Sequence, residues 1–169
     1  TSMASPQGAG ISAVLAQYIR GSGLEEKTGL DARQLNQSLI MSTATPIRDG
    51  ENGGYYYPVL QQGAGLANVY SAIAADSVIL MDEDATDSAS DGKVKAELGD
   101  DPDRQGRYSF SFTLQNITDQ PLTYRLSADF FTQGTFRQDG ETYLDTQTQA
   151  LEVSASWTAD GATLPLAEP

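Results

Sequence analysis

The sequence predicts an α+β fold in which helices occupy residues 1–77 and a β-sandwich occupies residues 78–169. Two observations support this division. Apolar residues recur at helical spacing as far as about Ala75, and beyond the acidic stretch at residues 82–92 they alternate with polar residues at strand spacing. We therefore predict two parts, with the change of periodicity near residue 77.

The first helix is predicted from about Ser5 to Arg20. Its residues are apolar or small on nearly every side, and no charged residue occurs before Arg20. This pattern is typical of a helix that is buried on all faces, so we expect it at the centre of a larger domain. The glycines of Gly21-Ser22-Gly23 are expected to end it.

Two further helices are predicted. Asp31 and Gln34 have the spacing of a capping box, which indicates a helix that starts there and reaches about Thr43. Its inward face is expected to carry Leu35 together with Leu39 or Ile40. A third helix is predicted over residues 66–74, where apolar residues follow the i, i+3, i+4, i+7 pattern.

Residues 47–58 are predicted to be a loop, because they contain Asp-Gly and Asn-Gly-Gly turn sequences. Three consecutive tyrosines, Tyr55, Tyr56 and Tyr57, end this loop. They are compatible with a platform on which a substrate stacks. We favour the simpler interpretation that they cover a domain surface, since aromatic side chains act mostly through the apolar area they bury.

Four segments with strand periodicity are expected to build the sandwich: residues 94–98, 108–114, 122–130 and 151–157. Residues 116–121 are predicted to turn between two long strands. A two-stranded hairpin alone is marginally stable, so we expect a second sheet packed on the first, in a fibronectin type III or immunoglobulin-like sandwich. The few predicted strands leave open whether this sandwich is complete.

The composition excludes several functions. A net charge of −13, from 23 acidic and 10 basic residues, argues against nucleic acid and against an anionic membrane as partners. The absence of cysteine and histidine removes thiolate and imidazole ligands, and no apolar run approaches the roughly 20 residues that cross a bilayer. The acidic residues 82–92 lack the full calcium-loop pattern, so we predict a solvated loop, no metal and no cofactor.

Ser2 is the candidate catalytic residue. Taken by itself, either Ser2 or Ser5 could cap the first helix, with Pro6 in the first turn where a missing N–H costs least. The other interpretation makes the hydroxyl a nucleophile at the positive end of the helix dipole, beside free N–H groups that hold an oxyanion. Helix caps are far more common than nucleophiles, and the residue types alone leave both interpretations open.

Residues Thr1 to Pro6, which read Thr-Ser-Met-Ala-Ser-Pro, resemble the nucleophile motif of subtilisin-like serine proteases without its leading glycine. Residues 39–44 and 61–70 are similar to the end of the catalytic domain in cell-envelope members of that family, of the lactocepin and C5a-peptidase type. The resemblance therefore covers about residues 1–77. Residues 110–116 and 121–124 resemble, more weakly, the fibronectin-III-like domain that follows it.

The resemblance implies that Ser2 is the nucleophile of a secreted or cell-envelope bacterial endopeptidase that hydrolyses polypeptides. The histidine base and the aspartate that orients it precede the serine in this family. We therefore expect them in an upstream part of the same catalytic domain. Because the chain contains no histidine, we expect the isolated 169 residues to be inactive.

Two alternatives stay open. Thr1 could be an N-terminal nucleophile whose own amino group is the base, although it precedes a helix start and not a strand. The chain could also be a non-catalytic binding or spacer module whose sandwich recognises a surface or a glycan. Trp157 is the one tryptophan available for sugar stacking. The sequence Asn-Ile-Thr at residues 116–118 matches a glycosylation sequon, but Asn116 is equally typical of a turn.

Overall fold

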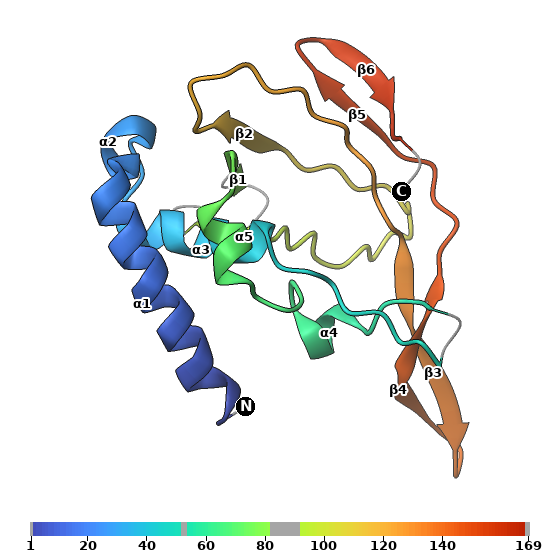
Figure 1. The fold of residues 1–169 in the computed structure, drawn as a ribbon. Coiled ribbons are helices and arrows are strands. Elements are labelled where there is room, and N and C mark those ends of the chain that lie inside the picture. Colours follow the sequence, from blue (N-terminus) through green and yellow to red (C-terminus); the bar gives the residue numbers. More distant parts are fainter. Residues whose placement is uncertain (1, 52–53, 82–91, 168–169) are drawn as a thin grey trace. The chain divides into compact units, whose positions relative to one another are not determined.

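The computed structural model describes residues 2–51, 54–81 and 92–167, and it combines helices with small antiparallel sheets (Figure 1). The chain divides into two compact units. We call residues 1–45 with 64–121 the helical unit, and residues 46–63 with 122–169 the β-rich unit. The mixed α and β content agrees with the predicted class. The predicted division into residues 1–77 and 78–169 stays a prediction.

The predicted first helix is confirmed as α1 (Ala4–Ser22), and a short α2 (Leu24–Thr28) follows it. Gly23 separates them in the left-handed conformation at φ 69°, which glycine adopts without strain. The expectation that α1 is buried on all faces is wrong for the described structure. Leu15 and Ile19 are buried, but Val14 is 49% exposed, because only one stripe of α1 packs against α3 and α5.

Helix α3 (Ala32–Ser42) starts with the predicted capping box. The Asp31 carboxylate accepts from the Gln34 N–H at 2.8 Å, and the Gln34 side chain accepts from the Asp31 N–H at 3.0 Å. Leu35 and Leu39 are fully buried, as predicted. They belong to the core of the helical unit, which comprises Leu15, Ile19, Leu24, Leu35, Leu39, Ala72, Val78 and Ile117.

The third helix is shorter than predicted, since α5 spans only Val69–Ile73. Asn68 caps it, and its side chain accepts from the N–H groups of Tyr70 and Ser71 at 3.0 and 3.2 Å. The predicted apolar stripe is only partly buried. Ile73 packs against the core, but Leu66 is 64% and Tyr70 is 77% exposed. Leu66 lies outside the helix because its backbone forms a bridge with Thr45.

The sheet of the helical unit pairs β1 (Ser77–Met81) with β2 (Phe112–Asn116) in antiparallel register. Ile79 lies opposite Leu114 in this ladder. Ser38 of α3 lies against the other side of β1, where its hydroxyl is hydrogen-bonded to the backbone of Ile79. Helix α3 thereby closes one edge of the small sheet.

The β-rich unit contains α4 (Val59–Gln62) and two hairpins. The first hairpin pairs β3 (Phe131–Gln138) with β4 (Glu141–Ala150), and the second pairs β5 (Ser156–Ala159) with β6 (Ala162–Pro165). Each turns through an Asp-Gly pair with positive φ at both residues, which suits the twist of a two-residue hairpin turn.

The expected sandwich strands are only partly found. Residues 94–98 are not a strand, residues 122–130 contain only a single bridge at Ser127, and the other two segments are strands only over residues 112–114 and 156–157. These strand predictions are wrong because alternation produces a strand only where a partner supplies the ladder hydrogen bonds. In the described part of the chain each sheet has two strands. The predicted turn at residues 116–121 is present, but β2 pairs with β1 and not with the segment that follows.

Candidate functional site

Ser2 lies exposed in the turn that leads into α1. The N-cap position of α1 is occupied by Met3, and no side chain forms a capping hydrogen bond there. Neither Ser2 nor Ser5 therefore acts as the cap that the simpler interpretation required. Pro6 is in the first turn, where its missing N–H removes no helical hydrogen bond.

The start of α1 is open to an anion. No acidic side chain lies in the first turn, and the first backbone N–H groups of a helix have no partner within the helix. These groups carry the partial positive charge of the helix dipole. Ser2 directly precedes the N-cap residue Met3, so it is close in the chain to donors of the kind that suits an oxyanion. The sequence contains no histidine to take the serine proton, and Thr1 lies outside the described residues.

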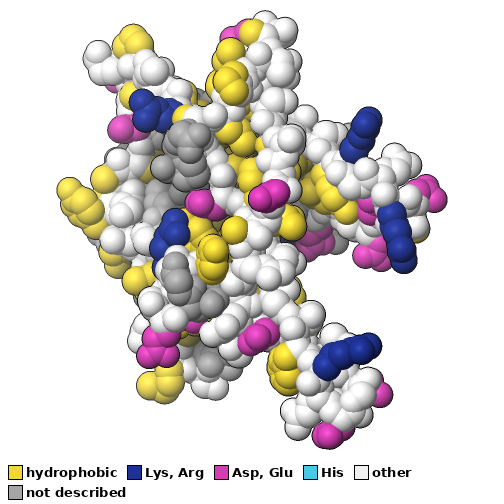
Figure 2. Space-filling model, turned by 90° about the vertical axis from the view of Figure 1, so that its right-hand side faces the viewer, with side chains coloured by type: hydrophobic (Ala, Val, Ile, Leu, Met, Phe, Trp, Pro, Cys, Tyr) yellow, Lys and Arg dark blue, Asp and Glu magenta, His cyan; other side chains and the backbone are white. Residues whose placement is uncertain are grey.

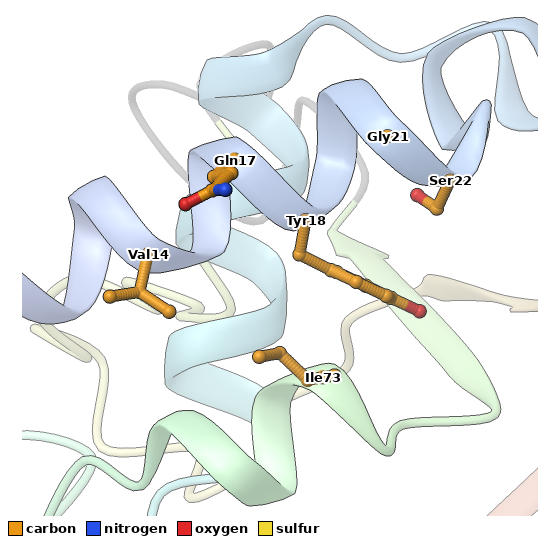
Figure 3. Close-up of a pocket in the computed structure, with 6 residues that line it drawn as sticks. All are labelled: Val14, Gln17, Tyr18, Gly21, Ser22 and Ile73. Atoms are coloured by element: carbon orange, nitrogen blue, oxygen red, sulfur yellow. The ribbon is translucent and has the colours of Figure 1, made fainter.

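A hollow of about 470 Å³ lies near the other end of α1 (Figure 3) and is lined by Val14, Gln17, Tyr18, Gly21, Ser22 and Ile73. In Figure 3 the side chains of Tyr18 from α1 and Ile73 from α5 both project into the space between these two helices. At a helical rise of 1.5 Å per residue, Tyr18 lies roughly 24 Å from Ser2 along the axis of α1, so this hollow is not next to Ser2. The Ser22 hydroxyl donates to the Ile19 carbonyl at 3.1 Å. With no acid and base side by side, this hollow offers binding space but no catalytic pair.

The β-rich unit has a second hollow of about 520 Å³, lined by residues 123–126 together with Trp157, Leu164, Pro165 and Ala167. The indole N–H of Trp157 donates to the Pro165 carbonyl at 3.2 Å, which holds the ring against β6. This is the place where the glycan-binding alternative would act, since Trp157 lines the hollow.

Tyr56 is the most highly connected of the three consecutive tyrosines. Its hydroxyl accepts from Arg48 at 2.6 Å and donates to Asp129 at 2.9 Å, and its ring lies 5.4 Å from the ring of Phe131. Burial, followed by the hydrogen bond to Asp129, raises the pKa of Tyr56, while Arg48 lowers it. This packing agrees with the covering interpretation for Tyr56 and not with a stacking platform. Neighbouring Tyr55 is 41% exposed.

Sequence reasoning missed Arg48 and Asp129, since neither residue belongs to a motif and they come from separate parts of the chain. The run of tyrosines was the only signal in the sequence that pointed to this cluster. The sequence also gave no sign that Ser38 pairs with Ile79, because a serine in the middle of an amphipathic helix is ordinarily taken for a surface residue.

Other kinds of site are not found in the described residues. No group of histidine, cysteine, aspartate or glutamate there could hold a metal ion. The acidic stretch that raised the question of calcium lies, over residues 82–91, outside the described residues. On the face drawn in Figure 2 the basic side chains are scattered singly. No helix within the described ranges is long and apolar enough to cross a membrane.

Comparison with known proteins agrees with the family that the serine motif suggests. The chain is similar to bacterial proteinases. It is 32% identical over 130 residues to the minor extracellular protease Vpr of Bacillus subtilis, a match that covers 77% of this chain and 14% of that protein. It is 30% identical over 142 residues to the PI-type proteinase of Lactococcus lactis subsp. cremoris and to the PII-type proteinase of Lacticaseibacillus paracasei. Each of those two matches covers 80% of this chain and 7% of the relative. No family model matches the chain.

Proposed function

We propose that this chain is the nucleophile-bearing part of a subtilisin-like serine endopeptidase, in which Ser2 attacks the peptide bonds of a polypeptide substrate. The observation that carries the proposal is the state of Ser2, which is exposed at the start of an uncapped helix without an acidic first turn. The resemblance of residues 1–6 to the serine motif and the similarity to named proteinases support it.

The chemistry follows from these groups. The Ser2 oxygen attacks the scissile carbonyl while a histidine takes the hydroxyl proton, and N–H groups at the start of α1 stabilise the oxyanion that forms. The C–N bond then breaks, the leaving amine receives the proton, and water hydrolyses the acyl-serine. Since this chain has no histidine, the base must come from other polypeptide, which we propose to be an upstream part of the same catalytic domain.

The surface of α1 supports a covering partner of this kind. Met3 is 79% exposed, and the stretch from Gln7 to Gly10 is exposed and uncharged. A solvent-facing helix ordinarily carries charged residues on its outer face. The relatives are much longer than this chain, which spans 14% and 7% of their lengths. We infer that the missing polypeptide packs on this face.

We also propose that the protein acts outside the cell or at the envelope of a bacterium, in line with its similarity to the extracellular protease Vpr. A fibronectin-III-like domain after residue 77 stays a prediction. This assignment rests on the weaker resemblance of residues 110–116 and 121–124.

The test is a matched pair of variants in the complete parent protein. Ser2→Ala is expected to abolish peptide hydrolysis and labelling by a fluorophosphonate probe. Ser5→Ala, in the first turn of the same helix, is expected to leave both largely unchanged. The isolated 169-residue chain should not be labelled. Hydrolysis that survives Ser2→Ala would reject the proposal and favour a binding or spacer module.

A further inference from the structure

The segment Pro46–Gly63 is flanked by two residues of the helical unit that pair with each other. Thr45 and Leu66 form an antiparallel bridge, in which the Thr45 N–H donates to the Leu66 carbonyl at 3.0 Å and the Leu66 N–H donates to the Thr45 carbonyl at 2.8 Å. The residues between them belong to the β-rich unit. The segment is therefore an excursion of the chain whose two ends meet at one bridge.

The excursion has internal order despite its loop-like sequence. The Tyr57 N–H donates to the Ile47 carbonyl at 3.1 Å, and the Asp49 N–H donates to the Tyr55 carbonyl at 2.7 Å. The Gln62 side chain accepts from the Ile47 N–H at 2.6 Å and donates to the Tyr57 carbonyl at 2.7 Å. These bonds tie the described parts of the excursion to one another.

Tyr56 joins the excursion to the later part of the β-rich unit through Asp129, β3 and β4. Its hydroxyl donates to Asp129, its ring packs beside Phe131 at the start of β3, and its carbonyl accepts from the Thr148 hydroxyl of β4. Arg48, from the other side of the excursion, donates to the Tyr56 hydroxyl and lies 4.1 Å from the centre of its ring. Thr148 is almost fully buried in this arrangement.

We propose that Tyr56 is an anchor that fastens the excursion to the β3–β4 hairpin, and that the β-rich unit requires this anchor to stay ordered. A two-stranded hairpin is marginal by itself, so the ring of Tyr56 and its hydrogen bonds supply packing that the hairpin otherwise lacks. It follows that the β-rich part is not a detachable spacer, because residues that precede the predicted boundary complete it. This inference is independent of the peptidase proposal.

Hydrogen exchange of the 169-residue chain, read by mass spectrometry, tests the anchor. Tyr56→Ala should accelerate exchange about tenfold or more in residues 47–57 and 143–150, because a charge-assisted hydrogen bond and the ring packing are lost together. Exchange in α3 should not change. Tyr56→Phe, which keeps the ring, should give a smaller acceleration in the same two regions. Tyr55→Ala is the matched control and should leave both regions as they are.

Two substitutions of Asp129 test the same anchor in case Tyr56→Ala fails to fold. Asp129→Asn keeps an oxygen that can accept from Tyr56 and should retain most of the protection, whereas Asp129→Ala should lose part of it in residues 47–57. The proposal is overturned if Asp129→Ala and Tyr56→Ala leave exchange in both regions unchanged. It is equally overturned if exchange in α3 rises as much, or if the unchanged chain shows no protection in residues 47–57.

Discussion

The hydroxyl of Ser38 forms two hydrogen bonds with a single residue, Ile79. It donates to the Ile79 carbonyl at 2.7 Å and accepts from the Ile79 N–H at 3.2 Å. Ser38 is fully buried, and its hydroxyl satisfies the N–H and carbonyl of Ile79 at the outer edge of β1, where no third strand of the described chain pairs. One helix residue thus covers this position of the small sheet.

Ser38→Ala should destabilise the chain by about 1–3 kcal/mol, because it leaves the N–H and carbonyl of Ile79 buried without partners. Ser42→Ala in the same helix is the matched control. The Ser42 hydroxyl oxygen is buried and has no hydrogen-bond partner among the described residues, so its removal should be neutral or slightly stabilising. Urea unfolding measures both, and equal midpoints for the two variants would contradict the role of Ser38.

Gly92→Ala should destabilise the helical unit more than Gly99→Ala. Both glycines have positive φ, 82° and 70°, so both substitutions carry the backbone cost of a left-handed alanine. At Gly92 a Cβ would also overlap the backbone of Gln34 in α3, whereas nothing lies near the Cβ position at Gly99. The extra cost of Gly92→Ala should be about 1–3 kcal/mol, as for other overpacked sites. Comparable thermal midpoints would show that this close approach is absent in solution.

The carboxyl of Asp101 should titrate below the ordinary range of aspartate. Its pKa is lowered first by the hydrogen bond from the Gly106 N–H at 2.6 Å and then by that from Gln105 at 3.0 Å. A pKa lower in the folded than in the unfolded chain means that the contribution to stability is present above the unfolded value and is lost as the pH falls through the folded value. Carbon-detected NMR titration of the side chain measures it, with the Gly106 amide shift moving at the same midpoint. An amide shift that is independent of this titration would mean that the turn is not held by Asp101.

Tyr56 should ionise at a higher pH than an exposed tyrosine. Burial and the hydrogen bond to Asp129 raise its pKa, which favours the neutral phenol in the folded chain. The resulting stabilisation is complete below the ordinary tyrosine pKa of about 10 and is lost as the pH rises through the folded value. The difference in ultraviolet absorbance titration between the unchanged chain and Tyr56→Phe isolates this group. A difference curve with the midpoint of a free tyrosine would contradict the packed position of Tyr56.

The first helix and the capped helix could be predicted from the sequence because their signals are local. The capping box of Asp31 and Gln34 joins residues three apart, and Gly23 ends α1 through its own backbone freedom. The predicted strands at residues 94–98 and 122–130 failed for the opposite reason. An alternating pattern is compatible with a strand, but the strand forms only where a partner is present.

The candidate site divides in the same way. The sequence itself contains the six-residue motif with Ser2 and the charge of −13. The motif suggested a serine peptidase, and the charge argued against a nucleic-acid partner. Only the tertiary structure decided that Ser38 pairs with Ile79 of β1 and that Tyr56 meets Asp129 and Phe131. These partners are far apart in the chain, and a buried donor or aromatic ring takes whichever partner the packing brings near it, which local residue preferences do not specify.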